Sequence, residues 1–449
     1  MVTVIAQPQV AQAVTCSALT PDPSPAVNRS NIQACLTGGN ATLTSGTFNV
    51  DSGITVGSNQ ILIGPTNPAT WPTIKLATGN TSNFLVRFDG SNSRVAFLTL
   101  DGNNAFGNYA NSSVVTFLSG GYNQLDNSHV MNAQLPTAGK KSTGVYLMGG
   151  IGHNQVLNNQ IHNNFLGVIF AATFTSSTGS TVSGNRIYSN KCDGITLAGY
   201  GEVNNNSIHE NGWDCENSIP GGGIYSLGNA RGARIDRNEI YNTCGHGLDL
   251  HKVAYFTITG NNVHDPGYTW SGAYPSCGGA AAAFLVDIRE STIQQNTFTN
   301  DNRPNNRMST DPNGVFSATG AAPLSDLPNG PFQTIAFVLA WDRNTAWTTA
   351  HNVIDANIMR SSCTSGCVGL GYFASRGTGY DQNGNWSAAT TNYYTNNNPS
   401  GSSYGSKRCG GNWYAANTSS CGTQAPCNYD DSQHPTSTNW ARNDGCYFY

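Results

Sequence analysis

The sequence predicts an all-β protein folded as a parallel β-solenoid, and three observations lead to this prediction. A segment of the form polar-x-Asn-x-apolar-His/Tyr-Asn recurs along the middle of the chain, at 125–132, 156–163, 182–190, 203–211, 235–242, 258–265 and 293–300. A second segment, Gly-apolar-x-apolar, alternates strictly with the first and begins at Gly144, Gly167, Gly194, Gly223 and Gly247, with 283–286 in the same place. No long helical run interrupts the pattern. Units of roughly 20–30 residues with short strands and Asn or Gly corners are typical of solenoid coils.

The composition fits a turn-rich β protein and excludes two classes of partner. Charged residues make up 10% of the 449 residues, less than half of the usual share of about 25%. The formal net charge of −4 offers no basic field, so we expect no nucleic-acid partner. No apolar run approaches the roughly 18 residues of a membrane span, so we expect no membrane insertion.

The cysteines and the N-terminus predict a secreted or extracellular protein. The chain has 12 Cys and no C-x-x-C pair, which favours disulfides formed in an oxidising compartment over a zinc site. Ala11-Gln12-Ala13 resembles a signal-cleavage site, so residues 1–28 are interpreted as a signal remnant and an extended N-terminus.

The other elements follow in chain order. Residues 31–36 predict a short capping helix, with Asn31 or Ser30 as its N-cap. Short alternating runs at 41–50, 54–63, 73–76 and 94–103 predict the first strands of a solenoid that covers 29–372 in roughly ten coils. Residues 373–449 are rich in Gly, Ser and Asn and contain four Cys, which predicts an irregular, disulfide-stapled C-terminal cap.

The repeat also resembles a known superfamily. The Asn-x-Ile-x-x-Asn and Gly-Ile-x-Leu motifs are similar to those of the right-handed parallel β-helix proteins that include pectate lyases, other polysaccharide lyases and mannuronan C5-epimerases. The resemblance is clear over about 90–300 and looser over 40–362. It implies a right-handed coil and a polysaccharide substrate.

One strand concentrates the charged residues of the chain. In the stretch from Gly247 to Lys252, Leu248 and Leu250 alternate with Asp249 and His251, which predicts an outward acid and an outward imidazole about 7 Å apart along the strand. When the Gly-apolar segments are aligned, Asp287 joins this pair from the next coil and Tyr225 lies one coil before it. The surrounding candidates are His246, Lys252, Arg289, Lys191 and Asp193.

These residue types suit proton abstraction from C5 of a uronate. That reaction needs a group that neutralises the substrate carboxylate, a base at C5–H and an acid for the opposite face or the leaving O4. The segment from Gly247 to His251 resembles the Gly-Phe-Asp-Pro-His segment of mannuronan C5-epimerases and alginate lyases, and 283–287 resembles their following coil. The resemblance implies that His251 is the acid/base, that Asp249 meets the substrate carboxylate and that Asp287 supports the site.

Two departures from the family pattern leave one role open. The Tyr that precedes the Gly in the family is His246 here, and the Pro is Leu250. The second proton-transfer group is therefore either His246 or Tyr225. Lys252, Arg289, Lys191 and Asp193 are the candidate substrate-binding residues.

Several alternatives remain open at this point. No cofactor is required, but Asp214 and Glu216 are candidates for a calcium site in the manner of pectate lyases, with Arg234 or Arg237 as base. A glycoside hydrolase would pair Asp249 with Asp287 or Asp214. A non-catalytic glycan-binding or adhesion solenoid would carry these side chains without chemistry. The recurring rings are expected to pack at the corners of the coils: His162, Tyr188, His209, Tyr241 and His264.

Overall fold

The computed structural model describes residues 14–16, 18–80, 82–106, 112–133, 142–148, 152–171, 179–215, 221–227, 230–267 and 280–301. Beyond residue 301 it describes nine short segments, which are 308–309, 332–341, 352–362, 367–374, 393–395, 398–400, 408–409, 412–413 and 447–448. The predicted cleavage site at 11–13 lies outside the described residues. Among those described, no helix is both long and apolar enough to cross a membrane.

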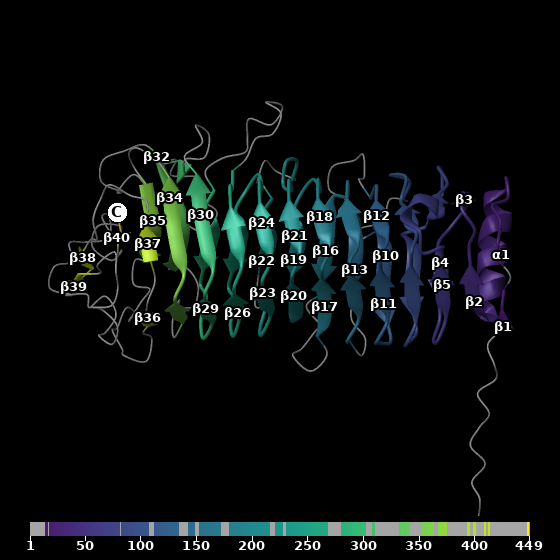
Figure 1. Cartoon of the computed structure of the whole chain (residues 1–449), viewed down its shortest axis with the longest axis horizontal. Coiled ribbons are helices and arrows are strands. Elements are labelled where there is room, and N and C mark those ends of the chain that lie inside the picture. The colour runs from purple at the N-terminus through teal and green to yellow at the C-terminus, as the bar shows by residue number, and fades with distance from the viewer. Residues whose placement is uncertain are drawn as a thin grey trace, which may run out of the picture.

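The chain winds into a right-handed parallel β-helix with three long sheets, which confirms the predicted fold (Figure 1). Sheet A contains β1 (Val14–Thr15), β2 (Gly39–Thr42), β5 (Ile61–Ile63), β8 (Arg94–Ala96), β11 (Gln124–Asp126), β14 (Gln155–Leu157), β17 (Ser180–Ser183), β20 (Gly201–Asn204), β23 (Arg234–Asp236), β26 (Thr257–Thr259), β29 (Thr292–Gln294), β33 (Val353–Asp355) and β36 (Tyr393–Thr395).

Sheet B contains β4 (Ile54–Val56), β7 (Phe84–Asp89), β10 (Ser112–Ser119), β13 (Ser142–Leu147), β16 (Leu166–Phe170), β19 (Ile195–Leu197), β22 (Ile224–Leu227), β25 (Leu248–His251), β28 (Ala283–Val286), β32 (Phe332–Trp341), β35 (Cys367–Ala374) and β40 (Tyr447–Phe448), with β31 (Met308–Ser309) paired to β32. Nearly all of its neighbouring strands run parallel. The exceptions are the antiparallel pairs that β31 and β40 form.

Sheet C contains β3 (Thr47–Val50), β6 (Thr73–Leu76), β9 (Thr99–Asp101), β12 (His129–Met131), β15 (Gln160–His162), β18 (Arg186–Tyr188), β21 (Ser207–His209), β24 (Glu239–Tyr241), β27 (Asn262–His264), β30 (Thr297–Asp301), β34 (Ile358–Ser362) and β37 (Asn398–Ser400). Its 12 strands are slightly more than the roughly ten coils predicted. Strands β36 and β37 extend sheets A and C into the predicted cap. A separate small sheet pairs β38 (Arg408–Cys409) with β39 (Asn412–Trp413), and η1 (Pro68–Thr70) is a single 3-10 turn.

The interior is built from stacked aliphatic residues and an asparagine ladder. Inward positions of successive strands in sheet C, such as Ile187, Ile208 and Ile240, are fully buried. At the corner between sheets A and C, one buried Asn per coil accepts the backbone N–H of the equivalent Asn before it, as Asn238 does for Asn206 at 3.0 Å. The ladder runs through Asn159, Asn185, Asn206, Asn238, Asn261, Asn296 and Asn357. It confirms the predicted stacking and satisfies backbone groups that would each cost about 1–3 kcal/mol unpaired.

The capping helix begins earlier than predicted. Helix α1 (Pro25–Thr37) lies at the N-terminal end of the stack (Figure 1), and its buried side chains include Ile32 and Leu36. The expected N-cap at Asn31 or Ser30 is wrong, because Ser24 is the N-cap and Pro25 supplies the first turn. A proline in that position has a fixed φ suited to the helix and no N–H to leave unpaired.

Candidate active site

From β10 to β28 the outward face of sheet B is almost free of charge, and the exception marks the candidate site; nearer the N-terminus, β7 carries the partly exposed Arg87–Asp89 pair. Strands β10, β13, β16, β19, β22 and β28 contain no Asp, Glu, Lys, Arg or His. Strand β25 contains both Asp249 and His251, each half-buried at an outward position. A charged pair on an otherwise neutral surface of this length points to a specific role rather than to general solvation.

Asp249 and His251 form a close ion pair. The His251 ring nitrogen Nε2 lies 2.7 Å from Asp249 Oδ1, and the two side chains remain 24% and 20% exposed. Burial alone would lower the pKa of His251, but the charge and hydrogen bond of Asp249, with the charge of Asp287, raise that pKa above its ordinary value. Burial would raise the pKa of Asp249, but His251 and then His246 bring it below its ordinary value. The contact through Nε2 leaves Nδ1 of His251 as the nitrogen for a substrate proton.

Tyr225 occupies the neighbouring position on the preceding strand. The ladder between β22 and β25 pairs Tyr225 with Asp249. Burial, and then the charges of Asp249 and Asp193, raise the pKa of the Tyr225 phenol. The phenol therefore keeps its proton and lies beside the ion pair as a potential acid.

His246 is held as a neutral ring. Its Nδ1 accepts the backbone N–H of Ala281 at 2.9 Å, so the proton of the neutral imidazole sits on Nε2. Burial lowers the pKa of His246, although the charge of Asp249 opposes this. The ring stacks on Phe284, with centroids 4.5 Å apart, and Phe284 also lies 5.5 Å from the His251 ring. Phe284 is thus a site residue that the sequence interpretation missed.

The predicted position of Asp287 is wrong by one residue. The register pairs Asp249 with Phe284 and His251 with Val286, so Phe284 and Val286 hold the positions assigned to Leu285 and Asp287. Asp287 lies in the turn after β28, with φ of 55° and no exposed surface. Its charge still raises the pKa of His251, so it supports the pair from the protein side.

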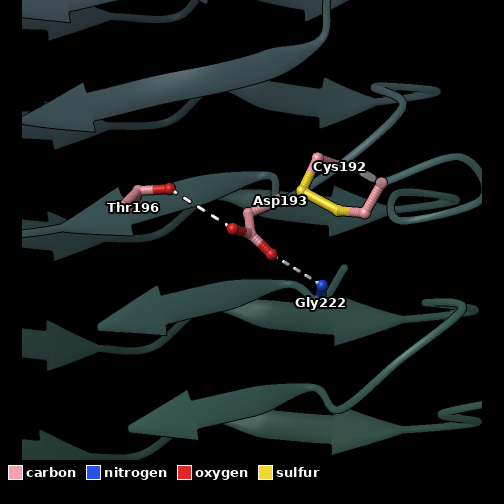
Figure 2. The surroundings of a disulfide bond; sticks show 5 residues. Cys192, Asp193, Thr196 and Gly222 are labelled. Atoms are coloured by element: carbon pink, nitrogen blue, oxygen red, sulfur yellow. Dashed lines mark hydrogen bonds between the residues drawn. A yellow bond between two sulfur atoms is a disulfide. The ribbon is translucent and has the colours of Figure 1, made fainter. Parts of the chain in front are cut away.

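Asp193 is fixed under the same face by two hydrogen bonds, shown in Figure 2. One of its oxygens accepts the Gly222 N–H at 2.9 Å, and the other accepts the Thr196 hydroxyl at 3.4 Å. The preceding Cys192 forms a disulfide with Cys215, which ties the following loop to this corner. Asp193 is thus engaged within the protein and acts on the site through its charge on Tyr225.

Three predicted cations lie in different settings. Lys191 pairs with Asp214 at 3.0 Å. Lys252 directly follows His251, in a turn with φ of 54°. The backbone of Arg289 forms a β-bridge with Ala254 at the corner towards sheet A. Of the three, Lys252 is the nearest in sequence to Asp249 and His251.

The predicted calcium site at Asp214 and Glu216 stays a prediction. Arg234 and Arg237 both contact Asp236 on the sheet A side, whereas Asp214 follows a strand of sheet C and pairs with Lys191. Glu216 lies outside the described residues. In the part of the chain that the structure describes, one group of three possible metal ligands comes together, namely Cys192, Asp193 and Cys215. Two of its three ligand atoms are the sulfurs of the disulfide.

Other disulfides are consistent with the predicted oxidising compartment. Cys16 pairs with Cys35 and so joins the N-terminal segment to α1. Cys244, just before His246, is also disulfide-bonded. The covalent links therefore include one at the helical cap and two that border the candidate site.

Comparison with solved structures identifies the same fold. The A-module of mannuronan C-5 epimerase AlgE4 from Azotobacter vinelandii is 16% identical, with a TM-score of 0.52 over 82% of this chain and 90% of that one. The A-module of AlgE6 from the same organism is 15% identical, with a TM-score of 0.55 over 82% and 88%. The Dettilon tailspike protein is 17% identical, with a TM-score of 0.54 over 84% and 66%. At these identities the likeness establishes the fold.

The sequence itself matches one family. No curated protein matches the chain. A family model described as periplasmic copper-binding protein (NosD) matches residues 102–332, which is just over half of the 449 residues. The protein therefore belongs to the NosD family.

Proposed function

We propose that the protein is a polysaccharide-active enzyme that removes the C5 proton of a uronate unit and so catalyses β-elimination or C5-epimerisation. The observation that carries the proposal is the Asp249–His251 pair, joined at 2.7 Å on a face that is otherwise uncharged from β10 to β28. The fold shared with mannuronan epimerases supports it.

The pair supplies a base whose ring is already oriented. Asp249 accepts the Nε2–H of neutral His251, so Nδ1 carries the lone pair that takes the C5 proton. The Asp249 carboxylate then stabilises the imidazolium that forms, which is the usual role of an acid behind a catalytic histidine. Because the pKa of His251 is raised, the base is strong but is available only above that pKa.

The remaining groups supply protons and neutralise charge. Tyr225 keeps its proton and is assigned as the acid for O4 or for the opposite face of C5. His246 presents Nε2–H, and Lys252 adds a positive charge next to His251. These two groups are assigned to the substrate carboxylate, whose negative charge must be neutralised before an enolate-like intermediate is accessible.

A hydrolytic mechanism has less support. It would pair Asp249 with Asp287 or Asp214, but Asp287 has no exposed surface and Asp214 is bound to Lys191. Two carboxylates that both reach a glycosidic bond are required for that chemistry.

Copper does not fit the described residues as they stand. The one cluster with enough donors joins its two sulfurs in a disulfide, so neither sulfur is the thiolate that a soft metal ligand requires. We therefore route no step through copper. Calcium dependence remains a prediction, and the disulfides and the family description support a periplasmic or extracellular location.

The direct assay follows the unsaturated product of elimination by its ultraviolet absorbance on a panel of uronate-containing polysaccharides, with and without EDTA. Epimerisation is followed in parallel by proton NMR of the recovered polymer. The wild type is expected to form one of the two products, and His251→Ala to form neither. No product on any member of the panel would contradict the proposal.

A further inference from the structure

The uncharged face of sheet B carries information about the substrate. On β13, β16, β19 and β22 the central outward positions are Tyr146, Ile169, Thr196 and Tyr225, which pair with one another in that order and then with Asp249. All four side chains are partly exposed. The strip therefore runs without interruption over four coils into the candidate site.

The strip suits the apolar face of a sugar chain. Successive coils are about 4.8 Å apart, which is close to the length of one sugar unit, so a chain that follows the solenoid axis meets about one outward side chain per unit. Tyr146 and Ile169 offer apolar surface to the C–H face of a sugar ring, and Thr196 offers a hydroxyl. Met148, which directly follows the last residue of β13, is 37% exposed and widens the apolar surface.

The same strip is poorly suited to a carboxylate on every unit. Each carboxylate that binds without a cation or a donor loses hydration without compensation. Strands β10, β13, β16 and β19 provide no cation, and Lys191 at the edge of this region is engaged by Asp214. Among the described residues on this face from β10 to β28, Lys252 places a positive charge next to His251.

We infer that the substrate is a heteropolysaccharide in which the reacting uronate is flanked by neutral sugars on the side of β13, β16 and β19, rather than a homopolyuronate. The inference rests on the proposed function, because it assumes that a uronate occupies the Asp249–His251 site. It adds a substrate class that the fold and the family do not specify.

Calorimetric binding tests this inference without relying on turnover. The His251→Gln variant is titrated, at low and at high salt, with three oligosaccharides of equal length: a homo-oligouronate, one in which a single uronate is flanked by neutral units, and a neutral one. The single-uronate oligosaccharide is expected to bind at least about tenfold more tightly than either of the others, with Kd changed less than about twofold by salt. Tightest binding of the homo-oligouronate, with strong salt dependence, would overturn the inference.

A pair of charge variants locates the neutral subsites. Ile169→Lys places a cation on the strip, and Thr181→Lys places the same charge at an outward position of β17 on sheet A. Ile169→Lys is expected to tighten binding of the homo-oligouronate about threefold to fivefold at low salt and to lose this gain at high salt, while Thr181→Lys has no effect. Equal effects of the two variants, or none from Ile169→Lys, would overturn the placement.

The two proposals fail in different ways. Faster turnover of homopolyuronates than of mixed polymers would contradict the inference and leave the proposed function standing. Tight binding of the single-uronate oligosaccharide with neither elimination nor epimerisation would contradict the proposed function and leave the neutral subsites standing. An absence of binding to all three oligosaccharides would contradict both.

Discussion

Two rows of rings on the outside of the solenoid contain histidines, and they differ in what surrounds them. On sheet C, rings stack coil upon coil with centroids 4.8–5.3 Å apart, in the order His162, Tyr188, His209, Tyr241 and His264. On sheet B, His251 is held edge-on by a carboxylate and His246 is held by a backbone N–H. An outward position on a strand is common to both rows, so position alone does not distinguish a packing histidine from a reactive one.

The pKa of His251 shifts in the opposite direction to those of His162 and His209. Burial lowers the pKa of His162 to about 4, where nearby His129 and Arg186 add to the effect, and burial also lowers the pKa of His209. Asp249 raises the pKa of His251. His264 at the end of the stack also has a raised pKa, but its Nδ1 bonds Asp265 at 2.9 Å and its Nε2 faces Glu239 at 3.8 Å. Both nitrogens of His264 are thus directed at protein carboxylates, whereas among the described residues only Nε2 of His251 contacts a carboxylate.

The largest effect is expected from His251→Ala. Removal of the base should lower kcat/KM at least about 1,000-fold, or about 4 kcal/mol of transition-state stabilisation. The matched control is His264→Gln, which changes an outward histidine that also has acidic partners and should leave kcat/KM within about twofold. Comparable losses in both variants would remove the distinction between the two rows.

A smaller loss is expected from Tyr225→Phe. If the phenol donates a proton to the leaving oxygen or to C5, its removal should lower kcat about 100-fold with little change in thermal unfolding. Tyr241→Phe in the stack on sheet C removes the same hydroxyl and should have no measurable effect on kcat. Full activity of Tyr225→Phe would transfer the acid role to His246.

Asp249→Asn is expected to change the pH profile. Loss of the carboxylate removes the charge and the hydrogen bond that raise the pKa of His251, so the acidic limb of kcat/KM should move to lower pH. The rate at the optimum should fall about tenfold, because the ring loses its orienting partner. An acidic limb that stays in place would show that a group other than His251 controls it.

The smallest effect concerns stability in the stacked row. Because the folded pKa of His162 is lowered, this residue destabilises the protein progressively as pH falls from its ordinary value of 6.5 towards about 4. His251 acts in the opposite sense, since its stabilisation is complete below its ordinary pKa and is lost as pH rises through its raised value.

The free energy of unfolding of the wild type is therefore expected to fall between about pH 7 and about pH 4. His162→Phe should make this fall about 1 kcal/mol smaller, allowing for solvent screening of the partly exposed ring. Denaturant unfolding at the two pH values measures this difference. An unchanged pH dependence in His162→Phe would contradict the electrostatic account of the stack.

The sequence was sufficient for the fold because each coil repeats the same local signals. Alternating apolar residues, a corner Asn and a Gly before the sheet B strand recur, and these signals correspond to strands and to the buried ladder through Asn206 and Asn238. The outward positions of Asp249 and His251 followed from the same alternation, but their direct contact at 2.7 Å did not. The resemblance to the β-helix superfamily then supplied the hand of the coil.

The register of the coil after β25 could not be read in the same way. The Gly that marks each earlier strand is replaced by a run of alanines at 280–283, and the predicted alignment, which placed Ala283 at the Gly position, was off by one residue. A shift of one residue exchanges the two faces of a strand, which placed Asp287 outside and hid Phe284. The start of α1 was missed because Pro25 was interpreted as part of an extended segment.

The most direct test follows the proton itself. The protein is incubated in D₂O with a polysaccharide in which each uronate is flanked by several neutral units, and deuterium at C5 and unsaturated ends are measured by NMR for the wild type, His251→Ala and His264→Gln. We expect C5 deuterium or unsaturated ends from the wild type and His264→Gln, and neither from His251→Ala. Either signal at wild-type rate in His251→Ala would contradict the assignment of His251 as the base.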